Sequence, residues 1–232
     1  MKKIKKRPQG TKEPQYNRQV HDMDKYGPAT MGLTTSYFWR HDPKHLLFTL
    51  GRYKFVAKMV IGKKRVAEVG CGDAFGARLL ASQGTRVDGY DFDPVFIDDA
   101  RRVNADVPGM TFAVHDILKK PLPKKYEAVY ALDVIEHIVP KQEKLFMKQV
   151  LKSILPKGML ILGSPNVTSQ KYASAPSREG HVNCKTHDEL RAFVATYFST
   201  VLLFSMNDEV VHTGFGSMAH YLFVIGVDPK KR

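Results

Sequence analysis

The sequence predicts an α/β protein built on a mostly parallel seven-stranded sheet, with helices on both faces and an antiparallel C-terminal strand. Three observations support this fold. Short β-rich runs alternate with helical patterns from residue 65 onward, a glycine-rich turn follows the first run, and the last two β-rich runs lie close together at the end of the chain. Alternation of this kind is typical of parallel strands that are joined by covering helices.

The elements follow from hydrophobic periodicity. Strands are expected at residues 65–69, 86–91, 110–115, 126–132 and 159–163, with a closing antiparallel hairpin at 200–205 and 219–227. Helices are expected at residues 76–82, 94–104, 141–155 and 186–197. Before the first strand, apolar residues from Leu46 to Val60 recur at helical spacing with Arg52, Lys54 and Lys58 between them, which predicts an amphipathic helix packed on the domain.

Charge is concentrated in the N-terminal part of the chain. The net charge is +13, and residues 1–65 carry +12 of it. Residues 1–40 show no sustained period, so we expect a basic flexible segment or cap there and one folded domain over residues 41–232. Such a segment could attract RNA, an anionic membrane, an acidic protein or a phosphorylated substrate, or it could be a solvated tail.

Composition excludes several classes of protein. Cys71 and Cys184 are the only cysteines, too few for a disulfide framework or a four-cysteine zinc site. No apolar run approaches the roughly 18 residues that would span a bilayer. These features predict a cytoplasmic protein.

Three strand ends carry features of a nucleoside site. Gly70 and Gly72 form a turn after the first strand that permits close approach of a ligand. Asp91 ends the second strand, 21 residues after Gly70, where a carboxylate can accept hydrogen bonds from both ribose hydroxyls. Asp116 follows the third strand, where it can accept a hydrogen bond from the adenine amine. The carboxyl ends of parallel strands meet at one edge, so these residues predict one adenosine-shaped crevice.

These residues resemble the class I S-adenosylmethionine-dependent methyltransferases, which have a Rossmann-like fold. The resemblance covers about residues 65–221 and rests on EVGCGDAFG from Glu68, YDFDP from Tyr90, HDI at Asp116 and ALDVIEHI from Ala131. The chain has Ala74 where the family often has a third glycine. A nicotinamide dehydrogenase is disfavoured, because the third glycine of the dinucleotide fingerprint is not at its expected spacing and the EHI element has no place there.

The resemblance implies S-adenosylmethionine as cofactor and S-adenosylhomocysteine as product. It places Glu68 beneath the amino-acid part of the cofactor, the two glycines at its floor, Asp91 at the ribose and Asp116 at the adenine. The full set of expected cofactor-binding residues is Glu68, Gly70, Cys71, Gly72, Asp91, Phe92, Asp116, Ile117 and Asp133.

The acceptor side offers Asp133, Glu136 and His137 after the fourth strand. This Asp-x-x-Glu-His pattern is similar to one in ubiquinone-biosynthesis O-methyltransferases that is implicated in divalent cation binding. Carboxylates and an imidazole could hold Mg²⁺, which would lower the pKa of an acceptor hydroxyl. Alternatively, these residues only contact the cofactor or shape the strand end.

Two further segments are expected to face the acceptor. The long polar stretch 164–184 contains His181, a candidate general base, and Arg178, which could bind an anionic acceptor; His181 could also serve only to fix the loop. The turn 207–214 contains Asp208, Glu209 and His212, which we expect to be structural or specificity residues. Tyr37, Phe38 and Trp39 could line an acceptor pocket or simply pack.

The leading hypothesis is an enzyme that methylates a hydroxyl oxygen of a small molecule in metabolite, quinone or sugar biosynthesis, with His137 and His181 as catalytic proton acceptors. A small-molecule N-methyltransferase stays open. So does an RNA or protein methyltransferase that uses the basic N-terminal segment, although the fourth strand lacks the Pro-Pro-aromatic element of nucleobase amino-methyltransferases. The third alternative is a non-catalytic adenosine-binding scaffold.

Overall fold

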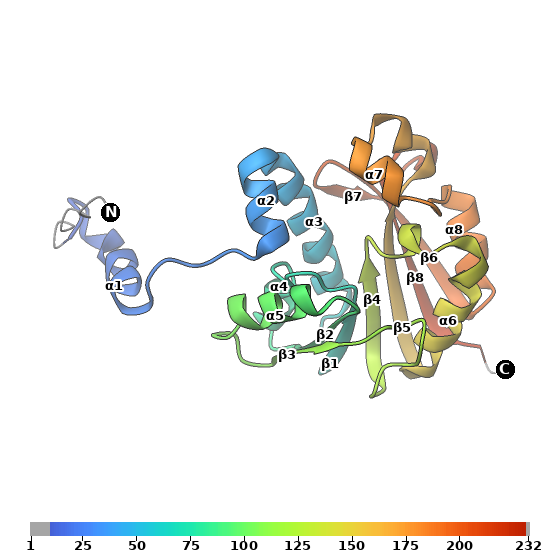
Figure 1. Cartoon of the computed structure of the whole chain (residues 1–232), viewed down its shortest axis with the longest axis horizontal. Coiled ribbons are helices and arrows are strands. Elements are labelled where there is room, and N and C mark those ends of the chain that lie inside the picture. The colour runs from blue at the N-terminus through green and yellow to red at the C-terminus, as the bar shows by residue number, and fades with distance from the viewer. Residues whose placement is uncertain (1–9, 231–232) are drawn as a thin grey trace. The chain divides into compact units, whose positions relative to one another are not determined.

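A single eight-stranded sheet dominates the computed structural model, which describes residues 10–230 (Figure 1). The strand order is β3-β2-β1-β4-β5-β8-β6-β7. Strands β1 to β5 are parallel to one another, whereas β8 pairs antiparallel with both β5 and β6, and β7 pairs antiparallel with β6. The strands are β1 Arg65–Val69, β2 Arg86–Asp91, β3 Met110–Val114, β4 Tyr126–Leu132, β5 Ile154–Pro165, β6 Phe198–Asn207, β7 Val210–His212 and β8 Tyr221–Pro229.

The described residues also form α-helices and short 3₁₀ helices. The α-helices are α1 Asn17–Tyr26, α2 Leu33–His41, α3 Pro43–Met59, α4 Arg78–Ala81, α5 Pro94–Val103, α6 Glu143–Lys152, α7 Ala175–Gly180 and α8 His187–Ala195. Short 3₁₀ helices are η1 Pro14–Tyr16, η2 Ile135–His137, η3 Pro140–Gln142, η4 Val167–Tyr172 and η5 Gly216–Met218. The alternation of β1-α4-β2-α5-β3 is the parallel βαβ arrangement that the sequence predicts.

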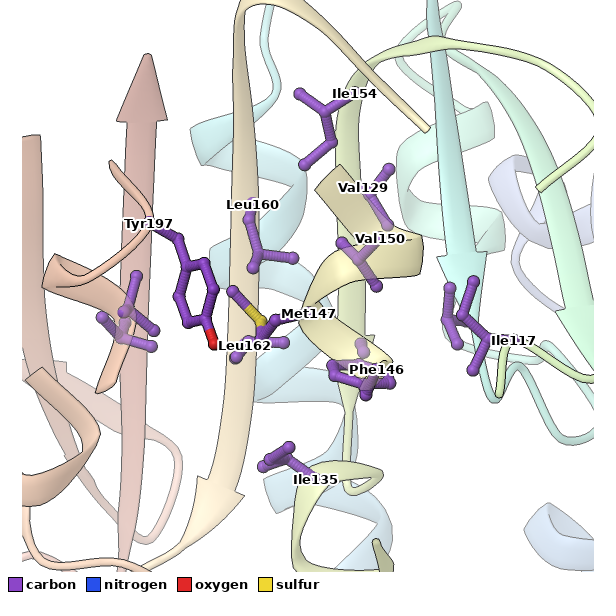
Figure 2. Packing of buried hydrophobic residues seen from close by; sticks show 14 of the residues in the cluster. Ile117, Val129, Ile135, Phe146, Met147, Val150, Ile154, Leu160, Leu162 and Tyr197 are labelled. Carbon is purple, nitrogen blue, oxygen red and sulfur yellow. The ribbon is translucent and has the colours of Figure 1, made fainter. Parts of the chain in front are cut away.

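Two apolar layers lie on opposite faces of the sheet. Successive residues of a strand point to opposite faces, so Val129 belongs to one buried cluster and Ala128 to the other. Helices α6 and α8 cover the first cluster, and α3, α4 and α5 cover the second. Figure 2 shows Phe146, Met147 and Val150 of α6 packed against the sheet. Burial of both faces explains the nearly continuous apolar runs of the central strands.

Local signals fix where several helices begin. The Thr186 hydroxyl accepts from the Glu189 amide while the Glu189 carboxylate accepts from the Thr186 amide, a reciprocal capping box at the start of α8. Asp93 caps α5 and precedes Pro94, whose missing N–H costs nothing in a first turn. These signals explain why the starts of both helices agree with the sequence prediction.

Three differences from the predicted elements have local causes. The predicted helix 141–155 ends at Lys152, because β5 begins at Ile154 and pairs with Tyr126. The sheet has eight strands rather than seven, since Val210–His212 adds β7 at the edge. The two C-terminal runs do pair antiparallel, but β7 interrupts the connection between them.

The N-terminal part contains two helices that the sequence pattern did not predict. Chain contacts divide the molecule into residues up to Met31 and residues from Gly32 onward, so α1 belongs to the first unit and α2 to the second. Lys2, Lys3, Lys5, Lys6 and Arg7 lie outside the described residues. The division into 1–40 and 41–232 stays a prediction. Within the described chain, no helix is long and apolar enough to cross a membrane.

Candidate active site

The turn after β1 depends on glycine for its backbone conformation. Gly70 and Gly72 have φ values of +73° and +52°, in the left-handed region that side chains disfavour. A Cβ atom on Gly70 would lie 2.4 Å from Cγ2 of Val134, so the turn also packs directly against the end of β4. Ala74, which replaces the family's third glycine, has a φ of +54° and therefore adopts a glycine-like conformation despite its side chain.

Asp91 connects the end of β2 to this turn. One carboxylate oxygen accepts from the Gly72 amide at 3.0 Å, and the other accepts from the Asp93 amide at 3.0 Å. The side chain is buried, whereas the next residue, Phe92, is 74% exposed. The sequence correctly placed Asp91 at the glycine turn, although it did not foresee the bond to the Gly72 amide.

Asp116 lies just beyond β3 at the same edge of the sheet. Its Oδ1 accepts from the Leu118 amide at 2.9 Å, and Lys119 lies 3.5 Å away as an ion-pair partner. The neighbouring Ile117 is buried in the apolar layer that α6 covers. Since the carboxylate is partly exposed and Ile117 is anchored, this segment presents Asp116 at a fixed position beside the strand ends.

Glu68 lies one residue before the end of β1 and is fully buried. Its two carboxylate oxygens accept from the hydroxyls of Tyr53 at 2.5 Å and Tyr130 at 3.0 Å. Burial raises the pKa of Glu68 to about 8, and the tyrosine hydrogen bonds only partly offset this rise. The carboxyl group is therefore mostly protonated at neutral pH. Cys71, also buried, has a thiol whose pKa is raised by the same desolvation.

A largely buried arginine of α3 holds Asp133. Arg52 Nη1 lies 2.7 Å from the Asp133 carboxylate, and the guanidinium stacks over the Tyr221 ring at 4.0 Å. The sequence pattern gave no sign of this contact, because Arg52 is 81 positions from Asp133. Asp133 itself has a φ of +57°, which turns the chain sharply after β4.

Helix α2 is anchored to the glycine turn by its first amides. The Asp73 carboxylate accepts from the Thr35 amide at 2.8 Å, and the Asp99 carboxylate accepts from the Leu33 amide at 2.6 Å. Carboxylates suit this position, because the amides at a helix N-terminus are unpaired and partly positive. Neither aspartate stood out in the sequence as a link to the segment before residue 41.

Two imidazoles and a carboxylate converge beyond β4. One ligand atom each from Glu136, His137 and His181 lies within 4.8 Å of the others, and the two imidazole rings are 5.1 Å apart. Glu136 is fully buried, and neither of its carboxylate oxygens has a hydrogen bond of good geometry among the described residues, although the nearby Ser164 hydroxyl favours its charged form. A buried carboxylate without well-aligned partners is costly, so this position is suited to a cation or a hydroxyl donor.

The Nδ1 atom of each imidazole is hydrogen-bonded to a neighbouring carbonyl oxygen. His137 Nδ1 lies 2.9 Å from the Gly180 carbonyl oxygen, and His181 Nδ1 lies 2.8 Å from the Gln170 side-chain oxygen. Since both oxygens only accept, each Nδ1 carries a proton, and each neutral ring keeps a lone pair on Nε2. Both histidines can therefore accept a proton or bind a metal ion through Nε2.

Burial affects the protonation of this cluster. Desolvation and the neighbouring His137 lower the pKa of His181, which keeps its imidazole neutral at physiological pH. Desolvation and the charge of Asp133 hold the pKa of Glu136 well above its usual range.

Backbone hydrogen bonds hold the two parts of the cluster together. The backbone carbonyl of Glu136 accepts from the amides of Val182 and Asn183, so the segment that carries His181 is attached directly to the residue that precedes His137.

In the turn after β6, the His212 side chain forms hydrogen bonds within the turn itself. His212 Nε2 lies 2.9 Å from Asn207 Oδ1, and its Nδ1 accepts from the Gly214 amide. Asp208 has a φ of +51° at the tip of the β6–β7 hairpin.

The aromatic residues of α2 differ in their packing. Phe38 stacks on His45 with ring centroids 4.0 Å apart, while Tyr37 and Trp39 are 60% and 57% exposed.

Comparison with known proteins finds similarity to methyltransferases over part of the chain. Residues 66–158 match the family model described as a methyltransferase domain. A probable S-adenosylmethionine-dependent methyltransferase of Mycolicibacterium smegmatis is 27% identical over 159 residues, 68% of this chain and 58% of that protein. A ubiquinone biosynthesis O-methyltransferase of Rickettsia bellii is 32% identical over 136 residues, 55% of each chain. The chain thus spans little more than half the length of these relatives.

A solved structure shows the same fold. The N-methyltransferase NodS from Bradyrhizobium japonicum, in complex with S-adenosyl-L-homocysteine, has a TM-score of 0.60 and 18% identity over 83% of this chain and 92% of its own. At this identity the likeness concerns the fold alone. The chain therefore has the Rossmann-like methyltransferase fold, and its residues 66–158 are similar to the methyltransferase domain.

Proposed function

We propose that this chain transfers the methyl group of S-adenosylmethionine to a hydroxyl oxygen of a small molecule. The observation that carries the proposal is the convergence of Glu136, His137 and His181 beside the end of β4. A hydroxyl is a weak nucleophile until its proton is removed, whereas a neutral amine needs no base. Two imidazoles with free Nε2 lone pairs and a buried carboxylate supply what an oxygen acceptor requires and an amine does not.

The cofactor is proposed to bind across the ends of β1 to β4. Asp91 would hold the ribose hydroxyls and Asp116 the adenine amine, with Gly70 and Gly72 as the floor. Cys71, Phe92, Ile117, Asp133 and Glu68 complete the proposed set. Arg52, which adjoins Asp133 and is buried, adds a cation beside the part of the site where the cofactor's carboxylate would lie.

The acceptor cluster also fits a divalent metal ion. Glu136, His137 and His181 would hold it, and the ion would lower the pKa of a bound acceptor hydroxyl. The fit rests on the poorly hydrogen-bonded oxygens of Glu136 and on the two imidazoles whose Nδ1 atoms are already oriented by carbonyl oxygens. Two imidazole ligands favour ions such as Zn²⁺ or Fe²⁺ over the Mg²⁺ that the sequence suggested. Asp133, expected as a ligand, instead pairs with Arg52.

Calorimetric titration tests the cofactor site first. We expect micromolar binding of S-adenosylmethionine and S-adenosylhomocysteine to the wild-type chain and loss of binding in Asp91→Ala. A folded wild-type protein that binds neither ligand would contradict the cofactor site and favour a scaffold role.

A panel of hydroxylated and amine acceptors tests the acceptor atom. We expect turnover on a hydroxyl acceptor to fall in both His137→Ala and His181→Ala, with cofactor affinity retained. Full activity in both variants, or turnover confined to amines, would exclude the proposed oxygen chemistry. Repeating the assay with EDTA and then with Zn²⁺, Fe²⁺ or Mg²⁺ separates metal activation from catalysis by the histidines alone.

A second candidate is methylation of RNA, which one feature of α6 favours. Lys141, Lys144, Lys148 and Lys152 are all exposed and recur every three or four residues, so they form one basic face. If RNA is the acceptor, a salt-sensitive complex should form and weaken in a variant with Lys144, Lys148 and Lys152 changed to Gln, or on deletion of residues 1–20. Absence of any complex at low salt would exclude this candidate.

A further inference from the structure

A cavity of about 480 Å³ that is open to solvent lies next to the cluster of Glu136, His137 and His181. This volume is sufficient for a small organic molecule. Its walls come from η4, from α7 and from the segment that follows α7. The residues that line it are Val167, Gln170, Lys171, Arg178, His181, Val182 and Cys184.

The charged side chains of this cavity are all positive. Lys171 and Arg178 line it, and no carboxylate does. Among residues 10–230, neither cation forms a salt bridge. Arg178 donates one Nη1 hydrogen bond to the Ala173 carbonyl, which fixes the guanidinium and leaves other N–H groups available. Glu179 is next in the chain but does not line the cavity.

His181 connects the cavity to the acceptor cluster. Its Nδ1 is hydrogen-bonded to Gln170, which also lines the cavity, while one of its ring nitrogens lies within 4.8 Å of the ligand atoms of Glu136 and His137. A molecule bound in the cavity therefore contacts an imidazole that also adjoins the other two groups. This arrangement allows one part of a substrate to be anchored while another part reaches the cluster.

The rest of the wall is apolar or neutral. Val167 and Val182 are 40% and 50% exposed, so each offers an uncovered apolar surface. Burial raises the pKa of the Cys184 thiol to about 12, so it adds no negative charge at neutral pH. The cavity thus combines an apolar surface for a ring or short chain with two cations for an anionic group.

We propose that the methyl acceptor carries an anionic group, a phosphate or a carboxylate, that binds between Lys171 and Arg178 and directs a hydroxyl toward His181. This inference rests on the proposed function, because that function places the reacting oxygen at the cluster. Arginine and lysine both bind oxyanions, and arginine can do so with two parallel hydrogen bonds.

The test measures binding to the full chain saturated with S-adenosylhomocysteine. The probes are catechol, 3,4-dihydroxybenzoate and (3,4-dihydroxyphenyl)phosphonate, which share the diol and differ in the anionic group. We expect the wild type to bind at least one anionic probe at least 10-fold more tightly than catechol. The double variant Lys171→Gln/Arg178→Gln should lose this preference and bind catechol as the wild type does.

A matched control removes two positive charges elsewhere. Lys125 and Arg191 are exposed residues that do not line the cavity, so Lys125→Gln/Arg191→Gln should keep the preference. Equal affinity for all three probes in the wild type would overturn the proposal. An equal loss in both double variants would also overturn it, because the effect would then come from overall charge.

The two proposals fail in different ways. Preferential binding that depends on Lys171 and Arg178, without methyl transfer to any hydroxyl, would support the anionic subsite and contradict the oxygen chemistry. Methyl transfer to catechol that neither the anionic group nor the double variant alters would support the chemistry and overturn the subsite. The carboxylate and phosphonate probes distinguish which of the two anions the subsite prefers.

Discussion

The cofactor side and the acceptor side of this site are built in opposite ways. On the cofactor side, Gly72 and Asp91 come from strands that lie side by side, and the Gly72 amide bonds directly to the Asp91 carboxylate. On the acceptor side, His137 and His181 are 44 positions apart and meet because α7 and the residues after it fold back over η2. The first arrangement follows from the parallel sheet, whereas the second depends on a long connection.

The two sides also satisfy their polar groups differently. Glu68 has two tyrosine partners and Asp91 has two amide partners, so the cofactor side is internally satisfied. Glu136 has no well-aligned partner for its carboxylate oxygens. A protein retains such a group at a cost in stability, which points to a role with a ligand. We therefore expect substitutions on the acceptor side to affect activity more than folding, and substitutions on the cofactor side to affect folding as well.

The largest expected effect is on methyl transfer in Glu136→Gln. The amide keeps the size of the side chain but cannot take up a proton or bind a cation as a carboxylate does, so turnover should fall on the order of 10³-fold. Unfolding by urea should show equal or greater stability than the wild type, because a buried ionisable group without well-aligned partners is removed. A stability loss that parallels the activity loss would show that Glu136 is structural.

The next effect concerns the pH dependence of stability through Glu68. Its pKa is about 8 in the folded chain and about 4.5 when unfolded, so the folded state binds more protons between these values. The stability that Glu68 contributes is complete below pH 4.5 and is lost as pH rises through 8. The unfolding free energy of the wild type relative to Glu68→Gln should therefore fall on the order of 3 kcal/mol between pH 5 and 8. A constant difference across this range would mean that Glu68 is ionised when buried.

The strand ends that form the proposed cofactor side could be predicted because their signals are local. Gly70, Asp91 and Asp116 each stand at the end of an apolar run, and parallel pairing brings such ends together whatever the intervening helices contain. The strand boundaries at β1, β2 and β4 agree with the prediction for the same reason, since both faces of these strands are buried.

The acceptor side could be predicted only in part. The Asp-x-x-Glu-His pattern and His181 were recognised, but sequence alone paired Asp133 with Glu136 and His137 as metal ligands. In the structure, His181 lies beside Glu136 and His137, whereas Asp133 forms an ion pair with Arg52. These choices depend on how α3 and the long connection pack, and no periodic pattern in the sequence records that packing. The cluster's chemical role stays a proposal.

A smaller effect compares two glycines that share a left-handed backbone. Gly70 has a φ of +73° and would place a Cβ atom 2.4 Å from Val134, while Gly84 has a φ of +83° and open space around it. Gly84→Ala should cost about 1 kcal/mol from backbone strain alone. Gly70→Ala should cost about 2 to 3 kcal/mol and weaken S-adenosylmethionine binding, because it adds a steric contact beside the proposed cofactor floor. Equal losses of unfolding free energy in the two variants would show that the Val134 side chain moves aside at no cost.

The smallest effect tests whether α2 belongs functionally to the cofactor side. Asp73→Asn keeps an acceptor oxygen for the Thr35 amide but removes the negative charge at the start of α2, which should cost about 0.5 to 1 kcal/mol. Hydrogen exchange should then increase across residues 33–41 and stay unchanged in α8, whose own capping box is intact. If the exchange in α2 slows on cofactor binding in the wild type and slows less in Asp73→Asn, then the helix and the glycine turn respond together. Exchange in α2 that is insensitive to both the variant and the cofactor would show that this helix takes no part in cofactor binding.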